Sequence, residues 1–185
     1  MSFATVEQLQ LRMNTTFDND SVPQVEALLE DATQAIRADI GQHVAPRQTA
    51  TFSDWPDSEG RVYLPQTPVV DVSAVTAKDM PVAFTLRDNY VTVPVTEKVT
   101  VTFTYGFAEV PRDLEHWTCV LTATALANLD LGVGLAPGGL SSVAIDDFRA
   151  SWADGGDKAG MTLPERVAQQ LREQYGGGTA VVTTR

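Results

Sequence analysis

The sequence predicts an α+β fold: a small helical bundle of about four helices, an inserted antiparallel β-sheet lobe and an extended C-terminal arm. Apolar residues recur at helical spacing near both ends of the chain, whereas its middle consists of short β-rich runs separated by Pro, Gly, Asp and Asn. A glycine run then separates the last helical pattern from a β-prone end. We therefore expect one domain over 1–185, made of an N-terminal helical pair (1–48), a β insertion (49–105), a long helix with a loop and a closing helix (106–175), and a C-terminal arm (176–185).

The first 48 residues predict two helices. Thr5 and Gln8 have the spacing of a capping box before a short helix, and Ser21 and Gln24 repeat that spacing before a longer helix over 22–40. The apolar face of the longer helix follows spacings of three and four and comprises Val25, Leu28, Leu29, Ala32, Ile36 and Ile40. The glycine that follows is expected to end this helix.

The β insertion predicts an antiparallel meander of about six short strands. Its last run, 98–105, alternates most clearly, because Val and aromatic residues face one way and threonines face the other. Pro65 and Pro68 lie around the third run and indicate an edge strand or a turn there. One face of the lobe is therefore expected to be exposed to solvent.

The stretch FTYGFAEVPRDL, residues 103–114, predicts a corner between the β insertion and the next helix. Phe103 and Tyr105 anchor the corner in the β layer, and Gly106 lets the backbone turn. Pro111 suits the first position of a helix over 111–131. An ordinary core corner satisfies the same pattern.

The remainder predicts a loop, an extended segment and a closing helix. GVGLAPGG (132–139) indicates the loop, and Val143, Ile145 and Phe148 indicate one more strand or extended segment. A third capping box, Thr162 to Glu165, begins a helix that ends at Tyr175.

Composition excludes several classes of protein. The chain has 24 acidic and 13 basic residues and a formal charge of −11, so it lacks the clustered Lys and Arg with which proteins bind nucleic acid. Its one cysteine excludes an internal disulfide framework and suits a reducing compartment. The N-terminus predicts no signal peptide, and no run of apolar residues predicts a membrane span.

No catalytic, cofactor-binding or metal site is predicted. The loop 132–139 lacks the glycine spacing of a nucleotide loop and follows a helix rather than a strand. Asp18 and Asp20 lack the further ligands of a calcium loop. His43 and His116 stand on different elements without a Cys or Glu at zinc-ligand spacing.

The remaining nucleophile and carboxylate candidates also favour structural roles. Cys119 lies among apolar residues of a helical pattern and is interpreted as a small buried hydrophobe. Asp146 and Asp147 are adjacent, so in a strand they point to opposite faces and do not form an acid–base pair.

Four segments follow one another along the chain: ATVEQLQLRM with VEALLEDATQAIRADIG, LPQTPVVDVSAVT (64–76), TYGFAEVPRDL (104–114), and AIDDFRASWA with LPERVAQQLREQY. Together they resemble the head-to-tail adaptor (head-tail connector, head-completion) proteins of long-tailed bacteriophages. In that family an opening helix pair precedes the strands of an insertion. A Tyr-Gly-aromatic turn then leads through an acidic residue and Pro-x-Asp into a long third helix, and an extended segment and a closing helix follow.

The resemblance implies a structural virion protein rather than an enzyme, without cofactors. Such a protein forms a homo-oligomeric ring of about twelve copies that joins the capsid portal protein to the next neck protein, a stopper or tail-side ring. The ring lines the DNA channel, and DNA passes through without specific binding. The implied location is the virion neck, after assembly in the host cytoplasm.

Two other classes stay open. A different neck or tail-completion ring, a stopper or tail terminator, is mostly β, whereas this chain has four helical segments. A small cytoplasmic hydrolase would place its site on acidic residues, and the absence of a His–nucleophile or carboxylate pattern weighs against it.

The arm, GGGTAVVTTR, combines three loose glycines with a β-prone end. This pattern suggests a tether whose terminal strand adds to a partner's sheet edge, and the alternative is a frayed terminus. The resemblance implies that the arm grips the portal. The portal-interaction residues are then hypothesised to be Thr179, Ala180, Val181, Val182, Thr183, Thr184 and Arg185.

Overall fold

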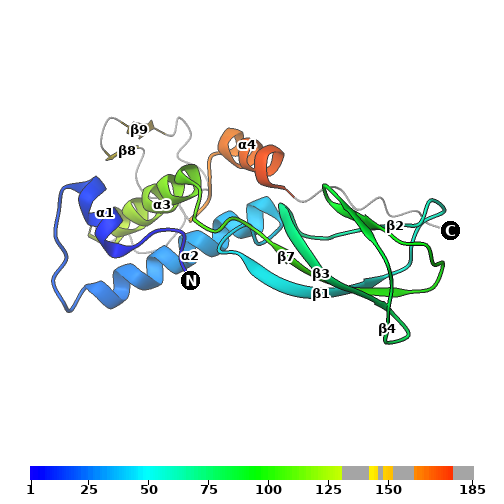
Figure 1. Cartoon of the computed structure of the whole chain (residues 1–185). Helices are drawn as coiled ribbons and strands as arrows, with labels where there is room; N and C mark the ends of the chain where they lie inside the picture. Colours follow the sequence, from blue (N-terminus) through cyan, green and yellow to red (C-terminus); the bar gives the residue numbers. More distant parts are fainter. Residues whose placement is uncertain (131–141, 146–147, 152–160, 177–185) are drawn as a thin grey trace. The chain divides into compact units, whose positions relative to one another are not determined.

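The computed structural model of the chain describes residues 1–130, 142–145, 148–151 and 161–176 (Figure 1). It confirms the α+β fold with four helices and an antiparallel β lobe; the C-terminal arm lies outside the described residues. The helices are α1 (Val6–Met13), α2 (Val22–Ile40), α3 (Arg112–Asp130) and α4 (Glu165–Tyr175). The strands are β1 (Gln48–Asp54), β2 (Arg61–Tyr63), β3 (Val69–Ala77), β4 (Met80–Pro81), β5 (Thr85–Arg87), β6 (Tyr90–Thr92), β7 (Val99–Tyr105), β8 (Ser142–Ile145) and β9 (Phe148–Ser151).

The chain divides into two compact units. The helical unit comprises Met1–Asp39 and Val110–Gln170, and the β unit comprises Ile40–Glu109 and Leu171–Arg185. Both units are therefore assembled from two separate stretches of sequence. None of the helices in the described ranges is long and apolar enough to cross a membrane.

Both helix starts near the N-terminus depend on short polar side chains. The predicted capping box before α1 is present, because Thr5 and Gln8 bond each other's backbone N–H. The predicted box at Ser21 is wrong. The Ser21 hydroxyl and N–H both donate to the Asp18 carboxylate instead, since Asp competes well for nearby backbone donors.

The core of the helical unit joins its first three helices. The apolar face predicted for 22–40 is buried, and residues from α1 and α3 pack with it. The buried cluster consists of Ala4, Leu9, Val25, Leu29, Cys119, Val120 and Ala123. At its rim the Arg12 guanidinium pairs with the Glu115 carboxylate at 2.7 Å and links α1 to α3.

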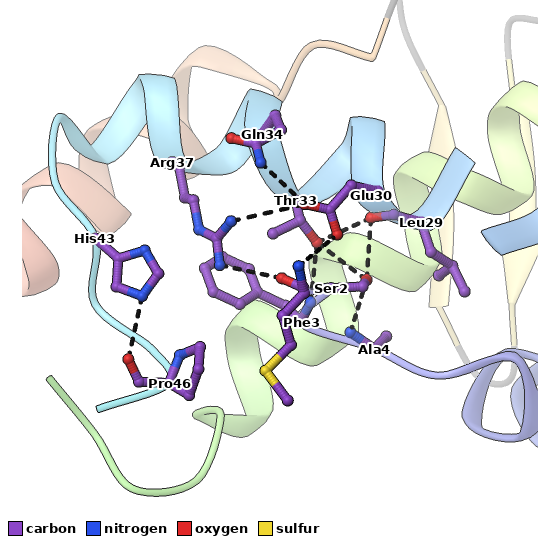
Figure 2. A network of polar contacts seen from close by, with 11 residues as sticks. Ser2, Phe3, Ala4, Leu29, Glu30, Thr33, Gln34, Arg37, His43 and Pro46 are labelled. Carbon is purple, nitrogen blue, oxygen red and sulfur yellow. Dashed lines mark hydrogen bonds and ion pairs between the residues drawn. The ribbon is translucent and has the colours of Figure 1, made fainter. Parts of the chain in front are cut away.

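The N-terminal segment is held against α2 by a buried hydroxyl, as Figure 2 shows. Thr33 donates its Oγ1–H to the Leu29 carbonyl at 2.8 Å and accepts the Phe3 N–H at 2.9 Å. The Arg37 guanidinium carbon lies 4.8 Å from the centre of the Phe3 ring. The segment before α1 is therefore fixed by both hydrogen bonding and cation–π contact.

The strands of the β unit form two antiparallel sheets. A four-stranded sheet has the order β1-β7-β3-β4, and a three-stranded sheet has the order β2-β6-β5. The lobe is therefore not a simple meander of six strands. Strand β7 lies between β1 and β3 because its buried alternate residues suit a central position.

The apolar face of the larger sheet supplies the core of the β unit. Val99, Val101, Phe103 and Tyr105 are buried, as the alternation predicted, and Val62 and Val91 of the smaller sheet belong to the same cluster. Pro68 directly precedes β3, and β4 pairs with β3 only at Thr76 and Ala77, so the proline stands where β3 has β7 as its one partner strand within the described residues.

Candidate functional site

The hypothesised portal-interaction residues, Thr179 to Arg185, lie outside the described residues, so their assignment stays a prediction. The same holds for the loop 132–139 and for Asp146 and Asp147, although β8 and β9, which lie before and after these two residues in the sequence, pair antiparallel. The other candidates from the sequence can be placed.

The structure places Cys119 in the interior of the helical unit. Its side chain is fully buried on α3 in the helical core. Burial raises the pKa of the Cys119 thiol to about 11, because the apolar surroundings disfavour the charged thiolate. The residue behaves as the small buried hydrophobe that the sequence predicted.

The two histidines belong to separate environments. The Nε2 of His43 lies 3.1 Å from the Pro46 carbonyl oxygen (Figure 2). The Nδ1 of His116 lies 3.4 Å from an Arg12 guanidinium nitrogen. Within the described ranges no group of three or more His, Cys, Asp or Glu residues is placed to hold a metal ion.

Asp18 has a structural role in the described structure. Hydrogen bonds from the Ser21 hydroxyl and then the Ser21 N–H lower the pKa of its carboxyl. The carboxylate is therefore engaged in closing the turn before α2.

The corner at Gly106 is built on backbone proximity. Gly106 has φ +89°, and a Cβ at this position would lie 3.0 Å from the Val44 carbonyl oxygen. That oxygen accepts the Phe107 N–H at 2.8 Å, and the Gly106 N–H donates to the Pro68 carbonyl at 2.9 Å. Glycine is needed here for its φ and for the close approach of two segments.

A buried amide, which the sequence did not reveal, connects three segments of the β unit. Gln42 is 6% exposed, and its Oε1 accepts the Thr67 N–H at 2.8 Å. Its Nε2 donates to the Thr67 hydroxyl at 2.9 Å and to the Tyr175 carbonyl. We call these three residues the amide clamp. It fixes the last turn of α4 beside the segment that leads into β3.

The second feature that the sequence did not reveal is the outer edge of β1. This strand is the end strand of the four-stranded sheet and pairs with β7 alone. Alternate β1 residues direct their backbone N–H and C=O away from β7, and no backbone hydrogen bond within the described ranges reaches them. Such an edge is a template for another strand.

The solvent-exposed face of this sheet carries paired hydroxyls. The Thr49 and Thr104 hydroxyl oxygens lie 3.0 Å apart, and those of Ser53 and Thr100 lie 2.8 Å apart. The face next to the open edge is thus polar and uncharged. An added strand would meet hydroxyls on one side and the half-buried Ala50 and Phe52 on the other.

No family model matches the chain, and a search of curated proteins found no match. The distinctive parts of the described structure are the corner at Gly106, the amide clamp at the end of α4 and the outer edge of β1.

Proposed function

We propose that this chain is a structural virion protein, a ring-forming adaptor that joins the capsid portal to the next neck component. The ring surrounds the channel through which DNA passes, and the subunit acts without a cofactor or reaction. It belongs to the virion neck and is assembled there from the host cytoplasm.

The observation that carries the proposal is the order of the elements. ATVEQLQLRM covers α1, and the segment ending in ADIG covers α2. TYGFAEVPRDL spans the end of β7, the corner at Gly106 and the start of α3. LPERVAQQLREQY covers α4. This order of helices and strands supports the proposal.

The charge supports the same role. A formal charge of −11 on every subunit gives an assembled ring a strongly acidic character. Such a ring offers passing DNA no track of Lys and Arg on which to adhere. We expect the isolated protein to show no tight, salt-sensitive binding of duplex DNA in a fluorescence anisotropy titration.

Attachment to the portal is the direct test. Purified full-length protein is mixed with portal-bearing heads that lack it, and the heads are then sedimented and imaged by negative stain. We expect the protein to sediment with the heads and to add density at the portal vertex. Heads that lack the portal serve as the control.

A chain shortened after Gly176 tests the portal-interaction residues. It is expected to fold but to remain in the supernatant when mixed with portal-bearing heads. Full-length protein that never sediments with these heads, and never labels virion necks with an antibody, would contradict the proposed function.

A further inference from the structure

We propose that two copies of this chain pair through the outer edges of their β1 strands, antiparallel to each other, about a twofold axis at Thr51. Only the β unit takes part in this contact. The inference goes beyond the proposed function, because a twofold contact uses the same surface on both copies, whereas a ring is closed by two different surfaces.

The outer edge of β1 is long and nearly uncharged. β1 has seven residues, of which only Asp54 at its end is charged, and it pairs with β7 without a register shift. Proteins generally protect such an edge with charges, bulges or a covering segment, because it otherwise pairs with another chain. In a chain of formal charge −11, an uncharged edge is also a surface on which two copies can approach without strong repulsion.

The opposite edge of the same sheet carries the protection that β1 lacks. β4 pairs with β3 only at Thr76 and Ala77. The rest of β3 has two register shifts against β7 and includes the charged residue Asp71. Bulges and charges disfavour the addition of a strand, so β1 is the edge of this sheet that suits a second copy.

The sequence of β1, QTATFSD, complements itself when two copies run antiparallel. With Thr51 opposite its own copy, Phe52 of each strand lies opposite Ala50 of the other, so a large side chain meets a small one on the half-buried face. On the exposed face Thr49 lies opposite Ser53, which continues the rows of hydroxyls already paired with β7. This register pairs all seven residues of both strands, and any shift leaves some of them unpaired.

The two ends of the strand carry complementary polar groups. Gln48 accepts the Tyr105 hydroxyl through its Oε1, which leaves its Nε2 to donate to the Asp54 carboxylate opposite it in the second copy. Arg47 directly precedes β1 and is exposed, as is Asp54. The antiparallel register brings the cation of each copy to the carboxylate of the other, once at each end of the paired strands.

An exposed aromatic ring lies at the same two ends. Trp55 directly follows β1, and its side chain is 63% exposed. One residue beyond the paired strands, Trp55 of each copy comes opposite Arg47 of the other, where an arginine can stack on the indole ring. The contact therefore gives a large exposed aromatic residue a partner.

A single cysteine on the twofold axis tests the register. The native Cys119 is buried, so Thr51→Cys supplies the exposed thiol. Residues directly opposite each other in an antiparallel pair have Cα atoms about 4.5–5.5 Å apart, a separation that a disulfide can span. Under mild oxidation the Thr51→Cys protein should form a covalent dimer on a non-reducing gel.

Ser53→Cys is the matched control, on the same strand and the same face. In the proposed register Ser53 lies opposite Thr49, so the two introduced thiols are separated by four residues, about 13 Å, and cannot bridge. Equal cross-linking of the two variants, or none in either, overturns the proposal.

Charge reversal tests the contact without a cross-link. Arg47→Glu and Asp54→Lys each place like charges together at both ends of the pair, so sedimentation equilibrium should show self-association weakened about tenfold. A mixture of the two variants regains opposite charges at both ends and should form dimers with one copy of each. Arg87→Glu changes the net charge as Arg47→Glu does, but it lies on β5 of the smaller sheet and should leave self-association unchanged.

The remaining outcomes contradict the contact. A wild-type chain that stays monomeric up to high micromolar concentration would show that the β1 edges do not pair. A dimer that survives both charge reversals unchanged, or a mixture that associates no better than its components, would place the contact on another surface. Neither experiment uses portal-bearing heads, so failure of this inference and failure of the proposed function are distinguishable.

Discussion

Replacing Gly106 with Ala should destabilise the β unit more than the same change at Gly41, although both glycines have positive φ. The φ values are +89° at Gly106 and +78° at Gly41, so an Ala is strained by a similar amount, about 1–2 kcal/mol, at either position. The two sites differ in what a new methyl group would meet. At Gly41 nothing lies within 4 Å of the Cβ.

The difference between the variants follows from the Val44 carbonyl. At Gly106 the Cβ would lie 3.0 Å from that oxygen and 3.4 Å from its carbon, which belong to backbone and cannot swing aside. Relief requires the carbonyl to shift and weakens its hydrogen bond from the Phe107 N–H, which contributes about 0.5–1.5 kcal/mol. Gly106→Ala should therefore lower the free energy of unfolding by about 1 kcal/mol more than Gly41→Ala does.

Gly60 extends the series to a closer contact. Its φ is +75°, and a Cβ would lie 2.6 Å from the Val93 carbonyl oxygen. The Gly60 carbonyl accepts the Val93 N–H at 2.8 Å, so the two segments are already bonded at this approach. Gly60→Ala is expected to be the most costly of the three changes.

Equilibrium urea unfolding followed by circular dichroism measures the series. With a slope of about 2 kcal/mol per molar urea, an extra 1 kcal/mol lowers the midpoint by about 0.5 M. We expect the highest urea midpoint for Gly41→Ala, a lower midpoint for Gly106→Ala and the lowest for Gly60→Ala. A midpoint for Gly106→Ala equal to or above that for Gly41→Ala would refute the steric reasoning at this corner.

Three further measurements test the helical unit. Thr33→Val should lower the free energy of unfolding by about 1–3 kcal/mol, because it leaves the buried Phe3 N–H without its acceptor. Thr118→Val should leave the free energy of unfolding nearly unchanged, because its hydroxyl donates only to the Leu114 carbonyl of its own helix. Equal losses of unfolding free energy in the two variants would count against this assignment. Leu121→Ala should lower the free energy of unfolding by about 2–5 kcal/mol, because Leu121 is buried on α3. An unchanged free energy of unfolding would show that Leu121 lies outside the core. Cys119 should stay unmodified by a thiol reagent at pH 8 in the folded protein and should react upon unfolding. The reason is that burial raises the pKa of its thiol to about 11, so the reactive thiolate is scarce at pH 8. Rapid modification of the folded protein would contradict its burial.

Local periodicity predicted most of the regular structure. The apolar stripe from Val25 to Ile40 and the alternation from Val99 to Tyr105 are both buried where the sequence placed them, because each pattern needs one apolar face to be covered. The pairing of β1 with β7 was not predictable in the same way. Short runs of similar composition do not specify which distant strand they join.

The features of the candidate site had weaker sequence signals. A single Gln after a helix stop gives no periodic signal, and Gln42 acquires its role only when Thr67 and Tyr175 come beside it. The bonding of Ser21 to the Asp18 carboxylate was equally hidden, since both side chains suit the start of a helix. The open edge of β1 is a property of sheet order, which local sequence does not encode.

The amide clamp has a consequence for how the chain folds during synthesis. The two units alternate along the sequence, and the Tyr175 carbonyl lies 133 residues beyond the Gln42 amide that binds it. Gln42 and Thr67 leave the ribosome early, together with most of the β unit, whereas Tyr175 follows the whole of α3. An unfinished chain therefore holds a Gln42 amide that is bonded to Thr67 but not yet to Tyr175. Only a polypeptide elongated past Tyr175 supplies the last acceptor, so translation itself sets when this bond can form.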